Sequence, residues 1–180
     1  TVFPIVQNGL IPVFVDISLD DFNLCLKDVR AMVKKQSIQA LMVIHTYGNP
    51  CDMDQVQEIC NNNNIILIED TCESMGASWR DKPVGSFGVV GTFSSYYSHH
   101  ICTFEGGLTI TNDNELSDIM KSIRSHGWIR GLKSIDKRKF DEKGFDLEFT
   151  FVNTGYNLRL SDPQAAMGIE QVKKLDKFVE

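Results

Sequence analysis

The chain has 180 residues, of which 42% are hydrophobic and 23% charged, the composition of a soluble globular domain long enough to bury one core. Its 18 Lys and Arg against 24 Asp and Glu give a net charge of −6, which argues against nucleic-acid binding, because phosphate neutralisation needs a clustered basic face. No apolar run approaches the ~20 residues of a membrane-spanning helix, so we expect no membrane insertion.

The cysteines are not arranged for cross-linking or for structural zinc. Their number is odd and no two form a Cys-x-x-Cys pair. No basic segment followed by an apolar stretch opens the chain, as a secretory signal would. We therefore expect free, mostly buried thiols in a reducing cytoplasm. These cysteines are Cys25, Cys51, Cys60, Cys72 and Cys102.

The first 70 residues alternate between strand and helix patterns. Residues 12–17 are β-rich, while residues 39–45 and 65–70 are nearly continuous apolar runs typical of buried strands. Between them, residues 26–35 carry apolar side chains at helical spacing. Asp52 is a suitable N-cap for a second helix, which the following asparagine run ends.

The rest of the chain is less regular. Residues 89–97 and 107–111 predict two further strands joined by a short loop, and Asp113 caps a periodic helix. Residues 127–146 are rich in charge and weakly periodic, which predicts a surface loop or flap. A last helix starts at Ser161 and carries an apolar stripe. That stripe consists of Ala165, Gly168, Ile169, Val172 and Leu175.

Strands and helices that alternate, with fully apolar strands, indicate βαβ units. The sequence therefore predicts an α/β fold with three αβα layers and a mostly parallel sheet that has helices on both faces. Ligands of such sheets bind beyond the carboxyl ends of the strands, so polar residues at those ends are the first candidates for a site.

Two carboxylates follow one predicted strand. Asp70 closes it, and from position alone a helix cap or loop acceptor is its default role. The functional alternative is a partner for a cationic ligand group such as a protonated pyridine nitrogen, whose ring acts as an electron sink. Glu73 lies three residues on and is either a second group beside that ligand or a solvated helix residue.

His99 and His100 are the strongest candidates for acid–base chemistry. Metal ligation needs further ligands at suitable spacing, and none accompanies this pair. A general base is favoured, because imidazole titrates near neutrality. His45 and His126 each stand shortly before a turn glycine and are interpreted as structural hydrogen-bonding residues.

Hydroxyls for a phosphate are available, but no phosphate loop is. Ser94 and Ser95 can donate to a phosphate, although serine in a strand is more often simply tolerated. Both common glycine-rich phosphate motifs and the esterase nucleophile elbow are missing. The residues by themselves leave the ligand open.

A series of short motifs runs in order along nearly the whole chain. They are Pro12-Val-Phe-Val-Asp16, His45-Thr-Tyr-Gly48, Asp52-Met-Asp54, Ile68-Glu-Asp70, Thr92-Phe-Ser94, Glu105-Gly-Gly107, Arg124-Ser-His-Gly127, Gly155-Tyr-Asn157-Leu-Arg159 and Gln164-Ala-Ala166. Their order and spacing resemble the sugar aminotransferase family of pyridoxal-phosphate enzymes, the DegT/StrS type of fold type I.

This resemblance implies a cofactor, either pyridoxal 5'-phosphate or pyridoxamine 5'-phosphate, and a role for each matching residue. Asp70 would pair with the pyridine nitrogen, Glu73 would lie beside the ring and Ser94 would contact the phosphate. Asn157 would reach the phosphate in the neighbouring subunit, which implies a homodimer with shared active sites.

One position departs from the aminotransferase pattern. The family's aminotransferases tether the cofactor through a lysine five residues after the serine of Phe-Ser, and counting from Ser94 gives His99. In this the chain resembles the dehydratase branch of the family, typified by the GDP-4-keto-6-deoxymannose 3-dehydratases. Imidazole cannot form the imine that a primary amine forms, but it moves protons. His99 would then be the catalytic residue of a 3-dehydratase acting on an NDP-4-keto-6-deoxyhexose in deoxysugar and O-antigen polysaccharide biosynthesis.

Two alternatives stay open: an NDP-4-keto sugar aminotransferase with a lysine from elsewhere, and a non-catalytic binding domain that has lost its cofactor. Family members are much longer, so the resemblance implies that residues 1–180 are the central part of the large cofactor-binding domain. The phosphate-loop segment and the small C-terminal domain would lie outside, and we expect the chain alone to be inactive. The implied substrate is a GDP- or CDP-linked 4-keto-6-deoxyhexose, and the implied location is the cytoplasm.

Overall fold

The computed structural model describes residues 1–180, which fall into two units: Thr1–Ile110 with Gln164–Glu180, and Thr111–Pro163. In chain order the elements are α1 (Phe3–Gln7), α2 (Leu26–Lys35), β1 (Ala40–Ile44), the 3-10 turn η1 (Thr46–Gly48), α3 (Met53–Asn63), β2 (Ile66–Asp70), β3 (Ser78–Trp79), β4 (Lys82–Pro83), β5 (Val90–Ser94), β6 (Gly107–Ile110), α4 (Asn114–Ile123), α5 (Arg138–Asp141), α6 (Asp162–Val172) and α7 (Leu175–Val179).

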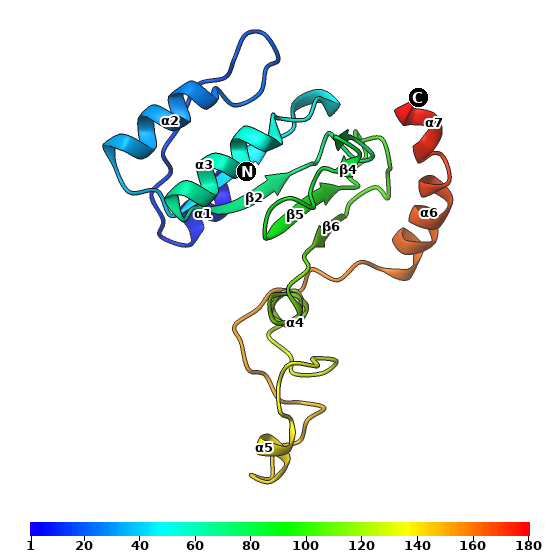
Figure 1. Cartoon of the computed structure of the whole chain (residues 1–180). Helices are drawn as coiled ribbons and strands as arrows, with labels where there is room; N and C mark the ends of the chain where they lie inside the picture. The colour runs from blue at the N-terminus through cyan, green and yellow to red at the C-terminus, as the bar shows by residue number, and fades with distance from the viewer. The chain divides into compact units, whose positions relative to one another are not determined.

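A four-stranded sheet in the order β1-β2-β5-β6 organises the first unit (Figure 1). Strands β1, β2 and β5 are parallel, with Ile44 opposite Asp70 and Asp70 opposite Thr92. Strand β6 runs antiparallel to β5. The predicted α/β class with a mostly parallel sheet is confirmed.

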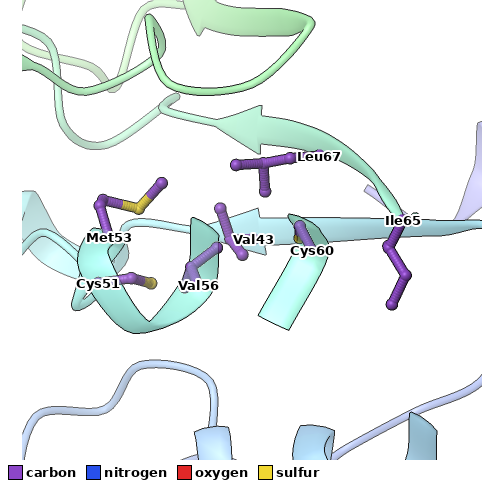
Figure 2. Packing of buried hydrophobic residues seen from close by; sticks show 7 residues of the cluster. All are labelled: Val43, Cys51, Met53, Val56, Cys60, Ile65 and Leu67. Atoms are coloured by element: carbon purple, nitrogen blue, oxygen red, sulfur yellow. The ribbon is translucent and has the colours of Figure 1, made fainter. Parts of the chain in front are cut away.

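Helix α3 covers one face of this sheet. Val43 of β1 and Leu67 of β2 point toward it and meet Met53 and Val56, as Figure 2 shows. Burying a side chain of this size contributes roughly 1.5–3 kcal/mol. Helix α2 packs beside α3. On the opposite face Ile66 is 51% exposed, so the described helices shield that face much less.

Local signals fix the ends of the helices as the sequence predicted. The Asp52 side chain accepts the backbone N–H of Gln55 at 3.1 Å and starts α3. Asn64 ends that helix in the left-handed conformation, with φ of 54°. Helix α2 spans the predicted residues 26–35. All five cysteines are free, but the prediction that most are buried is wrong, since only Cys51 and Cys60 are.

The prediction of a strand at residues 12–17 is wrong. This segment makes one isolated bridge, between Ile17 and Leu24, and no ladder. Its apolar side chains face solvent, with Phe14 70% exposed. A β-rich pattern reports a preference for extended backbone, but a strand persists only where a neighbour pairs with its N–H and C=O groups. No partner strand lies beside these residues in the described chain.

The last predicted helix forms as two pieces, α6 and α7. Its apolar stripe is largely uncovered, with Ile169 62% and Val172 53% exposed. Gly168 and Leu175 do pack within the first unit, against Thr103 and Gly76 respectively. Periodicity identifies the apolar face of a helix but not what covers it.

The second unit begins with α4, which Asp113 caps as predicted by accepting the N–H groups of Glu115 and Leu116 at 2.8 and 3.0 Å. The predicted loop over residues 127–146 is irregular apart from the single turn of α5. Asp118 anchors this loop, because its carboxylate accepts the backbone N–H groups of residues 133 and 134. None of the helices combines the length and apolar character that crossing a bilayer requires.

Candidate functional site

The carboxyl ends of the parallel strands meet at one edge of the sheet and bring candidate side chains together. Asp70 is the last residue of β2 and Ser94 the last of β5, and the register that pairs Asp70 with Thr92 places Ser94 two residues further along the neighbouring strand. Both side chains are half-buried. This is the edge at which open α/β sheets bind ligands.

The Asp70 carboxylate can accept more hydrogen bonds than it does. Oδ1 accepts the backbone N–H of Cys72 at 3.2 Å, and Oδ2 accepts the Thr1 hydroxyl at 2.8 Å. Because each carboxylate oxygen has two lone pairs, both retain room for a further donor. A half-buried carboxylate in this state suits a cationic N–H group.

Glu73 is held by the turn that follows β1. Its Oε2 accepts the backbone N–H of Tyr47 at 3.0 Å. Tyr47 has φ of 54°, a conformation that costs a non-glycine residue energy and persists only where surrounding contacts hold it. One of those contacts is the short hydrogen bond from the Ser74 hydroxyl to the carbonyl of His45. The turns after β1 and β2 are thereby joined beside Asp70.

Ser94 begins the turn that carries His99. Its Oγ accepts the backbone N–H of Tyr96 at 3.2 Å, which leaves the hydroxyl hydrogen free for an acceptor such as a phosphate oxygen. The His99 N–H donates to the Tyr96 carbonyl at 3.0 Å and closes the turn. The Tyr96 ring meets the imidazole edge-on, with centroids 6.3 Å apart. His100, next in the chain, is exposed.

Ser95 is not available as a second phosphate donor. Its side chain is 5% exposed and its Oγ lies 2.7 Å from Oγ1 of Thr103. Successive residues of a strand point to opposite faces, so of the two candidate serines only Ser94 faces the open edge.

Asn157 lies in the second unit. Its backbone bridges to Ser125, and its Oδ1 accepts the guanidinium of Arg159 at 3.3 Å. Its assignment to a cofactor phosphate stays a prediction, as do the roles given to Asp70, Glu73, Ser94 and His99.

Sequence reasoning missed the buried anion next to Asp70. Glu69 is fully buried and accepts three backbone N–H groups at 2.6–2.7 Å together with Nε2 of His45 at 3.2 Å. Burial raises the pKa of this carboxyl, but the hydrogen bonds outweigh burial and hold the pKa below its usual value. The three N–H groups belong to Gly85, Phe87 and Gly88.

His45 completes this network as a neutral ring. Its Nδ1 accepts the backbone N–H of Cys51 at 3.1 Å and therefore carries no proton, while Nε2 faces the Glu69 carboxylate and must donate. The predicted structural role of His45 is confirmed. Glu69 could have been found from strand alternation, since it shares a face with the core residue Leu67.

The arrangement combines an anion with free lone pairs, a hydroxyl with a free hydrogen and an imidazole on the next turn. No amine lies close in sequence, because the chain has no lysine between Lys82 and Lys121. Across residues 1–180 no three His, Cys, Asp or Glu side chains are grouped to hold a metal ion. The sheet edge and the turn after β5 thus offer an acceptor for a cationic group, a hydroxyl donor and an imidazole.

Comparison with known proteins places this geometry in context. The model of the DegT/DnrJ/EryC1/StrS aminotransferase family matches residues 1–180. GDP-4-keto-6-deoxy-D-mannose 3-dehydratase of Escherichia coli O55:H7 is 43% identical over 182 residues, which cover 99% of this chain and 46% of that protein. The chain thus spans about half the length of the curated relatives it matches.

Solved structures agree with this similarity. The E. coli GDP-4-keto-6-deoxy-D-mannose-3-dehydratase with bound hydrated PLP has a TM-score of 0.86 and 41% identity, covering 98% of this chain and 46% of that one. ColD is a GDP-4-keto-6-deoxymannose-3-dehydratase. Its double variant, with lysine for a histidine and asparagine for the serine before it, has a TM-score of 0.88 and 40% identity over 98% of this chain and 47% of its own. A Helicobacter pylori aminotransferase of pseudoaminic acid biosynthesis is more distant, with a TM-score of 0.81 and 28% identity over 96% of this chain and 42% of its own.

Proposed function

The chain belongs to the DegT/DnrJ/EryC1/StrS aminotransferase family, and from that premise we propose that the protein is a nucleotide-sugar 3-dehydratase dependent on pyridoxal or pyridoxamine 5'-phosphate. The feature that carries the proposal is His99, because counting five residues from Ser94 places it at the position that the resemblance assigns to the aminotransferases' lysine. The identity of 43% to a 3-dehydratase, against 28% to a solved aminotransferase, supports the same choice.

The residues at the sheet edge fit this cofactor. Asp70 has free lone pairs for a protonated ring nitrogen, and Ser94 has a free hydroxyl hydrogen for the phosphate. Glu73 would lie beside the ring, and Asn157 would reach the phosphate in a second subunit. When bound, the cofactor would supply an electron sink for the pair that a breaking C–H bond releases.

His99 would move the proton of the reaction. An imidazole nitrogen would take up the proton of the breaking C–H bond and return a proton to the 3-hydroxyl of the sugar, which would leave as water. A histidine at this position leaves the cofactor untethered, because its ring cannot form the imine that lysine forms. The two residues exchanged in the ColD variant are a serine and the histidine directly after it, and Ser98 directly precedes His99 in this chain. The same dipeptide also occurs at Ser125–His126.

The proposed substrate is a GDP- or CDP-linked 4-keto-6-deoxyhexose. The relatives' names support the GDP-linked form, and the CDP-linked form follows from the family resemblance alone. We propose a homodimer with shared active sites, working in the cytoplasm on deoxysugars for surface polysaccharide. An aminotransferase remains the alternative, and it requires a lysine from outside residues 83–120.

The test is an assay of the full-length protein with pyridoxamine 5'-phosphate and GDP- or CDP-4-keto-6-deoxyhexose. We expect a 3-deoxy product from the wild type and none from His99→Asn. Full turnover by His99→Asn would remove His99 from the mechanism. Borohydride reduction that fixes the cofactor to a lysine would favour the aminotransferase, and an absorbance spectrum that does not respond to added cofactor would favour a non-catalytic domain.

A further inference from the structure

A buried pair of hydroxyl groups closes the loop that carries His99. The loop leaves β5 and returns as β6, and its two sides meet at Ser95 and Thr103. The Thr103 N–H donates to the Ser95 carbonyl at 2.8 Å, and the Ser95 N–H donates to the Gly106 carbonyl at 3.0 Å. The two hydroxyl oxygens lie 2.7 Å apart, with the side chains 5% and 4% exposed.

The direction of the hydrogen bonds follows from what each group can donate. Oγ1 of Thr103 lies 3.0 Å from the Glu105 carbonyl and 3.4 Å from the Ser95 carbonyl, and both carbonyls only accept. The single hydroxyl hydrogen of Thr103 is therefore committed to a carbonyl, with Glu105 the nearer. Ser95 must then donate to Thr103, so the chain runs from the Ser95 hydroxyl through the Thr103 hydroxyl to the Glu105 carbonyl.

Helix α6 binds the last group of this hydrogen-bond series, the Glu105 carbonyl. Nε2 of Gln164, in its first turn, donates to the Glu105 carbonyl at 2.7 Å. One turn on, Gly168 lies against Thr103, and a Cβ at that position would come within 3.3 Å of the threonine methyl carbon. The hydroxyl chain thus joins the His99 loop to α6 with every hydrogen-bonding group satisfied, a condition in which buried polar groups rigidify a structure.

His99 lies between the two fastened residues. Ile101, 5% exposed, anchors the same segment from inside, and the Tyr96–His99 turn projects from it. The position of the imidazole relative to Ser94 and Asp70 therefore depends on where Ser95 and Thr103 hold the loop. A displacement of a catalytic group by about 1 Å can slow a reaction on the order of 100-fold.

We propose that Ser95, Thr103 and Gln164 are positioning residues that fix His99 at the sheet edge. They would touch neither substrate nor cofactor and would act through the loop backbone. The catalytic part of this inference rests on the proposed proton-transfer role of His99; the positioning part does not.

A measurement on the complete protein that needs no ligand tests the positioning. Histidine ring signals are recorded by NMR, and the His99 signal is identified by its loss in His99→Asn. We expect Thr103→Val, which keeps the shape and removes the hydroxyl, to shift or broaden the His99 signal. Thr103→Ser should restore it, and the His45 signal should stay unchanged in both variants. Thr109→Val on exposed β6 is the matched control that leaves the His99 signal as in the wild type.

Turnover tests the consequence, with pyridoxamine 5'-phosphate and GDP-4-keto-6-deoxymannose as probes. Thr103→Val should lower kcat on the order of 10-fold or more while KM stays within about twofold, and Thr103→Ser should keep most of kcat. If Thr103→Val does not fold, Ser95→Ala removes the same hydrogen bond from the other side.

The positioning role is overturned if Thr103→Val leaves both the His99 signal and kcat at wild-type values, or if Thr103→Ser is as impaired as Thr103→Val. Failure of the proposed function looks different. In that case His99→Asn keeps full turnover, whereas the effect of Thr103→Val on the His99 signal persists.

Discussion

Two neighbouring carboxylates in β2 have opposite surroundings. Glu69 faces α3 and the core, is fully buried and accepts four hydrogen bonds. Asp70 faces the other side at the strand end, is half-buried and accepts two hydrogen bonds, from Thr1 and Cys72. The first has its acceptor capacity met by the protein, and the second retains capacity for a ligand.

The same contrast separates His45 from His99. Both nitrogens of His45 are engaged, by Cys51 and Glu69. His99 is held through its backbone N–H and by the edge of the Tyr96 ring, and no hydrogen bond fixes its imidazole nitrogens within the described chain. A histidine whose nitrogens are both occupied stabilises the fold, whereas one held by its backbone can exchange protons.

The largest effect on stability should come from disrupting the hydrogen bonds of Glu69. Glu69→Gln turns a carboxylate oxygen into an NH₂ group that confronts the N–H donors around it. We expect the free energy of unfolding to fall by about 3 kcal/mol or more, since buried groups lose their only partner. Urea denaturation of the full-length protein measures the change.

Glu58→Gln is the matched control for that substitution. Glu58 is 55% exposed and pairs with Arg30 at 2.8 Å on the surface. Exposed pairs contribute little, so the loss should stay below about 0.5 kcal/mol. Equal losses from the two substitutions would contradict the central role of the Glu69 network.

Unlike Glu69→Gln, Asp70→Asn should affect turnover much more than stability. Asparagine keeps one oxygen that accepts the Cys72 N–H, and its NH₂ group can donate to the Thr1 hydroxyl, so the free energy of unfolding should change by less than about 0.5 kcal/mol. Turnover should fall on the order of 100-fold, because a neutral amide cannot hold a ring nitrogen in its protonated form. Cofactor titration followed by absorbance, together with the 3-dehydratase assay, separates the two effects; a stable protein with unchanged turnover would contradict the role of Asp70.

Features that depend only on neighbouring residues in the sequence were predicted, and features that depend on distant residues were not. The caps Asp52 and Asp113 and the bounds of α2 are encoded within a few residues and were predicted correctly. The strand at residues 12–17 failed, because pairing depends on a neighbour that local pattern does not report. Helix periodicity likewise found α6 but not the exposure of Ile169.

For the site, the rule that ligands bind at strand ends picked out Asp70 and Ser94, and the structure brings both to one edge. That rule does not select Glu69, because it looks for side chains at the open end of a strand, and Glu69 points to the buried face that it shares with Leu67. The pairing of Ser95 with Thr103 was also missed, since residues eight positions apart on either side of a loop carry no periodic signature.

The pH dependence of stability offers a finer test of Glu69. The pKa of its carboxyl is lowered in the folded state, so the unfolded chain binds the proton more readily and stability rises with pH in this range. The contribution is present above the ordinary value of 4.5 and is lost as the pH falls through the lower folded pKa. Unfolding free energies measured at several acidic pH values should fall less steeply in Glu69→Gln than in the wild type. The slope should not vanish, because the pKa values of Asp52, Asp118 and Asp136 are lowered as well.

Asp52 should show an intermediate effect on stability, because its surroundings lie between those of Glu69 and Asp70. Its carboxylate accepts the backbone N–H and the side-chain amide of Gln55, at 3.1 and 2.8 Å, and remains in contact with water. Asp52→Ala should lower the free energy of unfolding by about 1 kcal/mol, the usual cost of an N-cap, while Asp52→Asn keeps a capping oxygen and should recover most of it. If Asp52→Ala cost as much as Glu69→Gln, the number of hydrogen bonds and the depth of burial would not rank these carboxylates, and the distinction between a structural Glu69 and an available Asp70 would lose its physical basis.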